Sequence, residues 1–126
     1  MTTLDFADIH SLDQIAGASL QQLDRLEFGV IGFDDEGIVR FYNATESRYS
    51  GLSVEKVVGM HLFTVVAPCM NNYMVAQKYE DALVHGRELD EAIDYVLTLR
   101  MRPTLVKLRM MARPGLPLRY LLLHRC

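Results

Sequence analysis

The sequence predicts an α+β domain in which helices pack on a five-stranded antiparallel sheet. Two apolar runs in the first half and three more toward the C-terminus have the composition of strands, and helical or irregular segments lie between the two groups. Only short connections separate the last three runs, and short connections join antiparallel neighbours. A chain of 126 residues buries roughly two thirds of its unfolded surface, which suffices for one core without metal or disulfides.

The first element is the stretch "SLDQIAGASLQQLDRL" over residues 11–26. Spacings of three and four predict a short amphipathic helical segment, and the residues that carry them are Leu12, Ile15, Ser19, Leu20 and Leu23. An apolar stripe of this kind must dock on another element. We therefore expect residues 1–26 to form an N-terminal helical cap on a domain that spans residues 27–126.

Two strands are predicted next, at residues 28–33 and 37–42, on either side of an acidic turn. Gly37 can adopt the positive φ that a short hairpin loop needs. The pattern over residues 43–68 is irregular, and "SVEKVVGM" allows at most a two-turn helix with Ser53 as its N-cap.

A longer helix is predicted to begin after Asn72, a suitable N-cap, and to end just before Gly86. Its apolar stripe and last turn comprise Val75, Tyr79, Ala82, Leu83 and His85. Three strands complete the domain, at residues 89–100, 104–112 and 118–124, separated by "RP" and "RPGLP".

Charge and hydropathy argue against several classes of protein. The 13 basic and 16 acidic residues give a net charge of −3. The basic cluster alternates with apolar residues as on the solvent face of a strand, so nucleic acid is not an expected partner; it comprises Arg100, Arg102, Lys107, Arg109 and Arg113. The N-terminus is acidic where a signal peptide is basic, and no apolar run approaches the roughly 18 residues of a membrane span. We expect a cytoplasmic protein without membrane contact, monomeric or weakly dimeric.

Cys69 lies in the apolar stretch "VVAPCM", and the second cysteine, Cys126, is the last residue. Without a CxxC or a Cys/His pair at ligand spacing, neither a disulfide framework nor a zinc site is expected. Free cysteines are commonly buried and inert. A histidine could instead activate the thiol as in a cysteine hydrolase, although no cysteine-enzyme signature surrounds it; the candidates are His10, His61, His85 and His124. The residues alone leave these readings open.

Tyr42 and Glu46 are a second set of residues that could form a binding site. If "NATES" forms a helical turn, side chains four residues apart point the same way and can present two donors to one point. A solvated Glu46 beside a half-buried Tyr42 fits the spacing equally well. Asn43 and Ser50 are residue types that suit caps and turns and require no ligand.

"YNATE" at 42–46 followed by "VAPC" at 66–69 resembles the photoactive yellow protein family, bacterial blue-light receptors with the PAS fold. The likeness extends over nearly the whole chain, through "LEFGVIGFDDEGIVRFYNATE", "VVGM" before "HLF", and "MRPTLVKLRM". It implies a non-enzymatic photosensor that acts on an unidentified downstream signalling protein. A PAS-type ligand-binding or interaction module without a chromophore is the alternative.

The resemblance implies that Cys69 carries p-coumaric acid (4-hydroxycinnamic acid) as a thioester. It implies that Tyr42 and Glu46 hydrogen-bond the phenolate, that Ser50 braces Tyr42, and that the Cys69 backbone N–H holds the thioester carbonyl. Asn43 would tie the 43–51 segment to the fold. Light would drive trans–cis isomerisation and proton transfer from Glu46. The remaining pocket residues implied are Leu52, Val66, Ala67, Pro68, Met70, Leu99 and Met101.

Elementary electrostatics agrees with these implied roles. A phenol loses its proton near pH 10, so a buried phenolate at neutral pH needs strong donors. Glu46 can donate only when protonated, and burial beside an anion favours the protonated form.

The chain departs from the family at Leu52, where an arginine is usual, at Met70, where a threonine is usual, and at Leu99, where an aromatic is usual. The connection from the longer helix to the next strand is also one residue longer. Met101 matches a position linked in the family to thermal recovery. We expect these departures to affect solvent gating, colour and recovery rate while leaving attachment intact.

Overall fold

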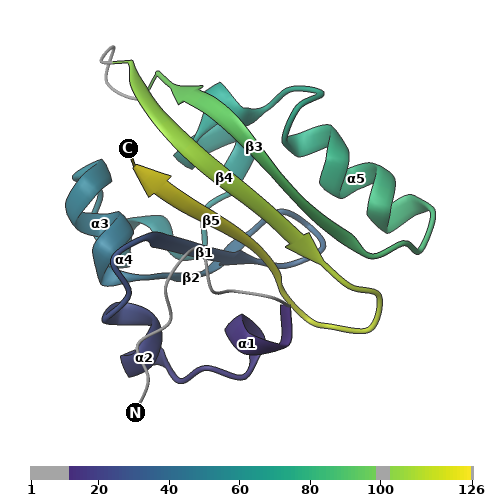
Figure 1. Cartoon of the computed structure of the whole chain (residues 1–126), viewed down its shortest axis with the longest axis horizontal. Coiled ribbons are helices and arrows are strands. Elements are labelled where there is room, and N and C mark those ends of the chain that lie inside the picture. Colours follow the sequence, from purple (N-terminus) through teal and green to yellow (C-terminus); the bar gives the residue numbers. More distant parts are fainter. Residues whose placement is uncertain (1–11, 99–102, 126) are drawn as a thin grey trace.

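The three-dimensional structure is a computed structural model that describes residues 12–98 and 103–125. A five-stranded antiparallel sheet has the order β2-β1-β5-β4-β3 (Figure 1). Its strands are β1 (Gly29–Phe33), β2 (Val39–Tyr42), β3 (Leu89–Leu97), β4 (Thr104–Ala112) and β5 (Arg119–Arg125). The predicted α+β class is confirmed, and the last strand inserts beside the first.

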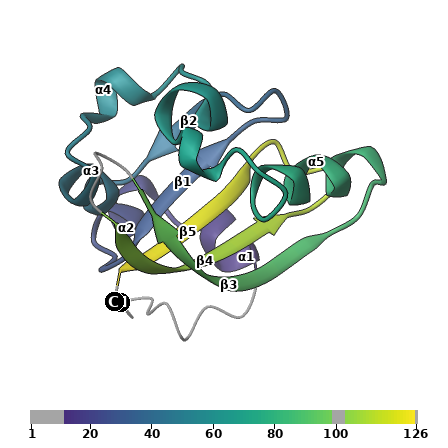
Figure 2. The same cartoon turned by 90° about the horizontal axis from the view of Figure 1, so that it is seen from above.

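Helices cover both faces of this sheet. The segment between β2 and β3 contains α3 (Ala44–Ser50), α4 (Val54–Val57), the π-helical turn η2 (Leu62–Val66), the 3-10 turn η3 (Pro68–Met70) and α5 (Ala76–Val84). Figure 2 shows α4 and α5 on the same side of the sheet. Two further helices precede β1, namely α1 (Leu12–Ala16) and α2 (Leu20–Asp24).

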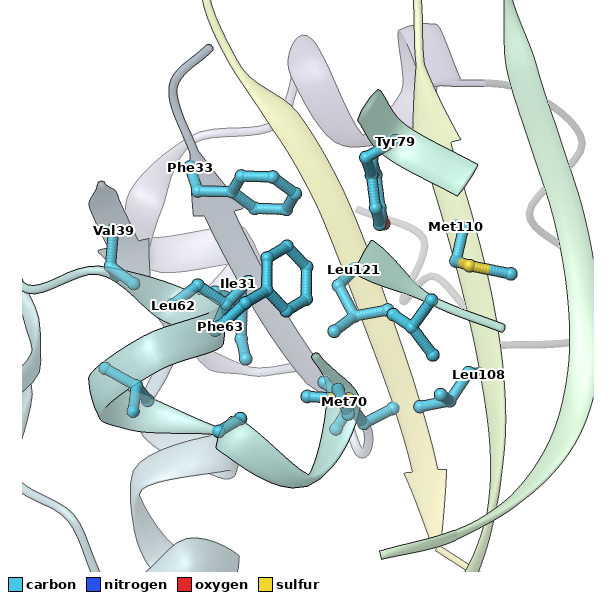
Figure 3. Close-up of a cluster of buried hydrophobic side chains, with 14 of the residues drawn as sticks. Ile31, Phe33, Val39, Leu62, Phe63, Met70, Tyr79, Leu108, Met110 and Leu121 are labelled. Atoms are coloured by element: carbon cyan, nitrogen blue, oxygen red, sulfur yellow. The ribbon is translucent and has the colours of Figure 1, made fainter. Parts of the chain in front are cut away.

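Strand β5 separates two hydrophobic cores because successive strand residues point to opposite faces. Leu121 and Leu123 belong to the larger core, under α4 and α5, whereas Leu122 belongs to a second core with α1 and α2. In the larger core, Phe33 packs edge-on against Tyr79 with ring centroids 4.8 Å apart, and Phe63 lies beside them (Figure 3).

The N-terminal segment forms two short helices where the sequence predicted one. A break precedes Ser19, which starts α2 in a capping box with Gln22. Leu12, Ile15 and Leu23 are buried as expected, but Leu20 is 65% exposed. Leu20 therefore does not belong to the docking stripe, because the break rotates α2 relative to α1. Residues 1–11 of the expected cap lie outside the described residues.

The hairpin between β1 and β2 has Gly37 at φ 83°, as predicted. Asp34 closes this loop, since its Oδ1 accepts hydrogen bonds from the backbone N–H groups of Glu36 and Ile38. The Asp34 loop occupies residues that the sequence assigned to the start of the second strand, so β2 begins at Val39.

One predicted helix start needs correction. Helix α5 begins at Ala76, because the Asn72 side-chain oxygen accepts from the N–H groups of Met74 and Val75 and caps the preceding turn instead. The start of α4 is as predicted, because Ser53 is its N-cap, although the Ser53 side chain makes no cap hydrogen bond. Leu83 is also half exposed and is not part of the buried stripe of α5.

Within the described parts of the chain, no helix combines the length and apolar character that crossing a bilayer requires. Strand β3 ends at Leu97, so Thr98 of its predicted span is not in the strand, and residues 99 and 100 of that span are not described.

Candidate functional site

Asn43 fixes α3 against the first strand and the segment before it. It is fully buried and is the N-cap of α3. Its Oδ1 accepts from the N–H of Val30 and of Glu46, both at 3.0 Å. Its Nδ2 donates to the carbonyls of Leu23, at 2.8 Å, and Phe28, at 3.1 Å. The side-chain amide of Asn43 therefore uses both its donors and its acceptor. These bonds connect α3 to the rest of the fold, as the resemblance implied for Asn43.

Tyr42, at the end of β2, and Ser50, in the last turn of α3, are both buried and face each other. The Tyr42 hydroxyl donates to Ser50 Oγ at 2.8 Å, and the backbone N–H of Leu52 donates to the same oxygen at 3.1 Å. Burial raises the pKa of Tyr42 above its usual value, and the nearby Glu46 carboxyl raises it further. Tyr42 is thus a neutral phenol that can donate a hydrogen bond.

Glu46 is 1% exposed, and its carboxyl group is paired with Arg125 from the end of β5. Arg125 Nη1 lies 2.6 Å from Oε1 and Nη2 lies 3.0 Å from Oε2. Burial raises the pKa of Glu46, while Arg125 acts in the opposite direction. In this geometry both Glu46 oxygens accept hydrogen bonds, so its expected role as a proton donor stays a prediction.

Gly29 makes room for this carboxyl group. A Cβ atom at position 29 would lie 2.0 Å from Glu46 Oε1. The strand therefore needs glycine here because α3 approaches β1 so closely.

The sequence reasoning did not single out Arg125. The two members of the pair are 79 residues apart, so no local spacing links them. A signal was nevertheless present, since alternation along β5 places Arg125 on the same face as Leu121 and Leu123, where a charged residue must find a partner.

Cys69 is a free, half-buried cysteine in the short turn η3. Its carbonyl oxygen accepts from the Tyr95 hydroxyl at 2.6 Å and from Asn72 Nδ2 at 3.2 Å, and Asn72 Nδ2 also donates to the Tyr95 oxygen at 2.7 Å. Tyr95 and Asn72 thereby hold the backbone of Cys69. Neither contact was predicted. Tyr95 lies on β3, 26 residues from Cys69, whereas Asn72 is only three residues away but was assigned to the N-cap of the next helix.

His61, a candidate partner for a reactive thiol, has a different role. Its Nδ1 accepts from the N–H groups of Phe63 and Thr64 at the start of η2. His10 and Cys126 lie outside the described residues.

The expected pocket residues gather around one core. Tyr42, Val66, Ala67 and Met70 are buried members of the larger core, and Leu52 and Cys69 are partly buried against it. Figure 3 shows Met70 beside the strands that carry Leu108 and Leu121. Pro68 is exposed, so its ring is not part of this buried lining. Leu99 and Met101 lie outside the described residues.

Comparison with known proteins gives consistent matches. The PAS fold family matches residues 20–120. The photoactive yellow protein of Rhodothalassium salexigens is 34% identical over 89 residues, which cover 71% of this chain and 70% of the relative. That of Halochromatium salexigens is 32% identical over 110 residues, which cover 87% of each.

A solved structure shows the same likeness. The photoactive yellow protein domain of the sensor histidine kinase Ppr from Rhodospirillum centenum superposes with a TM-score of 0.79 at 35% identity. The match covers 88% of this chain and 96% of that domain.

Proposed function

The chain belongs to the photoactive yellow protein family of PAS-fold proteins, and from this premise we propose that it is a blue-light photoreceptor whose Cys69 carries a 4-hydroxycinnamoyl thioester. One observation carries the proposal. A buried hydroxyl and carboxyl pair, Tyr42 and Glu46, lies at the same core that the free thiol of Cys69 borders. The protein acts as a sensor and not as an enzyme.

The residues present fit such a group. Its acyl end needs a thiol on a fixed backbone, and Cys69 has its carbonyl held by two donors. Its phenolic end needs buried polar partners, which Tyr42 and Glu46 supply. Its ring needs an apolar lining that excludes water, and Val66, Ala67 and Met70 are all buried.

Each side chain has a separate task in this mechanism. When bound, the group would supply blue-light absorption and trans–cis isomerisation about its double bond. Tyr42, neutral because burial raises its pKa, donates a hydrogen bond to the buried oxygen. Glu46 would hold a proton on its carboxyl group in the dark and pass it to the phenolate oxygen of the group after light absorption. In the structure the Tyr42 hydroxyl donates to Ser50 Oγ. With the group bound, the Tyr42 proton would point to the group's oxygen, and the Ser50 hydroxyl would donate to the Tyr42 oxygen and hold it in place.

We further propose that the light-induced change is read by another signalling protein. The Rhodospirillum centenum relative is a domain of a sensor histidine kinase, which supports a protein partner as the receiver of the signal.

The test is covalent loading. Protein made without the group is mixed with the anhydride of 4-hydroxycinnamic acid, so that the Cys69 sulfur gains one acyl group and loses its proton, and the second half of the anhydride leaves as the free carboxylate. Intact mass should rise by one hydroxycinnamoyl group, and the protein should turn yellow. Cys126→Ala should load like the wild type, whereas Cys69→Ala should stay folded and colourless. Equal loading of the Cys69→Ala variant would overturn the assignment.

A further inference from the structure

Arg125 is a nearly buried guanidinium between two side chains of α3. Its side chain is 12% exposed. One side pairs with the Glu46 carboxyl through two hydrogen bonds, and the guanidinium carbon lies 4.8 Å from the centre of the Tyr49 ring. Tyr49 itself is 58% exposed. The guanidinium of Arg125 therefore contacts the buried Glu46 carboxyl group on one side and the solvent-exposed Tyr49 ring on the other.

The paired geometry requires an ionised Glu46. A carboxyl group whose two oxygens both accept from a guanidinium has no proton to give. The dark-state role proposed above requires a protonated Glu46, which leaves Arg125 without an anionic partner. Because a buried charge without a partner costs several kcal/mol, the position of Arg125 must follow the protonation state of Glu46.

We propose that Arg125 is a switchable counterion of Glu46. Its guanidinium moves away from the carboxyl group when Glu46 is protonated and forms the ion pair with it once Glu46 has lost its proton. In its released position the guanidinium stays on the Tyr49 ring and reaches water. The light-dependent part of this inference rests on the proposed function, whereas the ion pair in the chromophore-free protein does not. Arg125 is in this sense a positioning residue that neutralises the charge that proton transfer leaves in the core.

The surroundings of Glu46 contain few other groups that could take this role. Arg125 and Tyr42 are the side chains that shift the titration of its carboxyl group. Gly29 from β1 brings no side chain, and Tyr49 contacts the guanidinium from α3. A change in Glu46 titration on replacing Arg125 can therefore be assigned to this pair.

The first experiment uses the chromophore-free protein. Its Glu46 carboxyl titration is followed by infrared spectroscopy, with Glu46→Gln identifying the band. Removing the positive charge in Arg125→Gln should raise the midpoint by at least about one pH unit, roughly tenfold in the protonation equilibrium. Arg125→Lys keeps the charge but loses the bidentate hydrogen bonding, so it should raise the titration midpoint by less. Arg119→Gln, on the same strand, should match the wild type. An unchanged midpoint in Arg125→Gln would overturn the ion pair.

The second experiment uses protein loaded with the chromophore. After a blue flash, the infrared signal of Glu46 deprotonation should be at least about tenfold smaller or shorter-lived in Arg125→Gln than in the wild type and Arg119→Gln. An identical signal in all three would overturn the switch even if the titration supports the pair. If none of the proteins loads, the proposed function fails, while the titration still decides whether Arg125 pairs with Glu46.

Discussion

At the scale of single residues, Gly29 controls how closely α3 can approach β1. The Gly29→Ala variant places a methyl group 2.0 Å from Glu46 Oε1, so α3 or the carboxyl group must move. We expect a loss of about 1–3 kcal/mol in the free energy of unfolding, as for other overpacked sites. Denaturant unfolding measures it.

Gly32→Ala is the matched control on the same strand. There the added methyl group would meet side-chain atoms of Phe41, Tyr120 and Leu118 at 3.3–3.4 Å, which a small adjustment relieves. A loss in Gly32→Ala as large as that in Gly29→Ala would contradict a special role for the space beside Glu46.

The buried Glu46 also makes stability depend on pH. Because burial raises its pKa above the ordinary value of 4.5, the folded protein keeps this proton at pH values where the unfolded chain has released it. The resulting stabilisation is complete below about pH 4.5 and is lost as pH rises through the folded-state pKa. Urea unfolding of chromophore-free protein should therefore show Glu46→Gln gaining stability relative to the wild type as pH rises. Parallel pH profiles for the two proteins would show that Glu46 titrates normally.

At the scale of elements, β3 holds the turn that carries Cys69. Tyr95→Phe removes the hydroxyl that donates to the Cys69 carbonyl and accepts from Asn72. In a Cys126→Ala background, this change should make the Cys69 thiol react several-fold faster with a thiol reagent, because about 1 kcal/mol of hydrogen bonding is lost. Tyr73→Phe is the control, since Tyr73 is 78% exposed. Equal rates in both variants would mean that η3 is held by other contacts.

Most strands could be predicted because their signals are local. The apolar runs and the turn at Gly37 placed β1 and the three C-terminal strands within a few residues of their observed bounds. Helix starts were less accurate, because the Asn72 side chain can cap a turn as well as a helix. The break between α1 and α2 was missed for a similar reason, since Ser19 fits an apolar stripe by spacing although it caps a new helix.

The candidate site was predicted only in part. Tyr42, Asn43, Glu46 and Ser50 are close in sequence, so one short helix brings them together. The partners of Glu46 and Cys69, Arg125 and Tyr95, come from strands distant in sequence. Their contacts depend on how β5 and β3 are placed in the sheet, which no local pattern encodes.

At the scale of the whole molecule, α3 connects the site to the opposite face of the sheet. Four hydrogen bonds join its N-terminal end to the end of α2 and the segment after it. Two come from Asn43 Nδ2, one runs from the Ala44 N–H to Asp24 Oδ1, and one runs from Thr45 Oγ1 to the Leu26 carbonyl. The helices α1 and α2 in turn cover the second core. A shift of α3 that breaks these bonds therefore loosens the N-terminal helices.

This connection predicts where the light signal emerges. In the structure Arg125 pairs with Glu46 while the bonds from Asn43 and Thr45 to residues 23–28 are intact, so the ion pair alone does not stretch these bonds. We expect the light-driven change at Tyr42 and Glu46 to displace α3, and these bonds are the contacts that then stretch. The helices α1 and α2 are short and dock through a narrow apolar stripe, so we expect them to open before the sheet does. Opening would uncover the apolar residues of the second core and create a light-dependent surface for a signalling partner.

Hydrogen exchange of the loaded protein, measured in darkness and under continuous blue light, tests this route. Exchange should become faster in residues 12–26 and 43–51, while β4 and β5 stay protected because they pair along most of their length in the middle of the sheet. Asn43→Ala breaks the same connection without light, so its dark exchange over residues 12–26 should already approach that of the illuminated wild type. If the chromophore bleaches and exchange over both segments stays the same, the signal leaves through another part of the protein, and the bonds of Asn43 serve the stability of α3 alone.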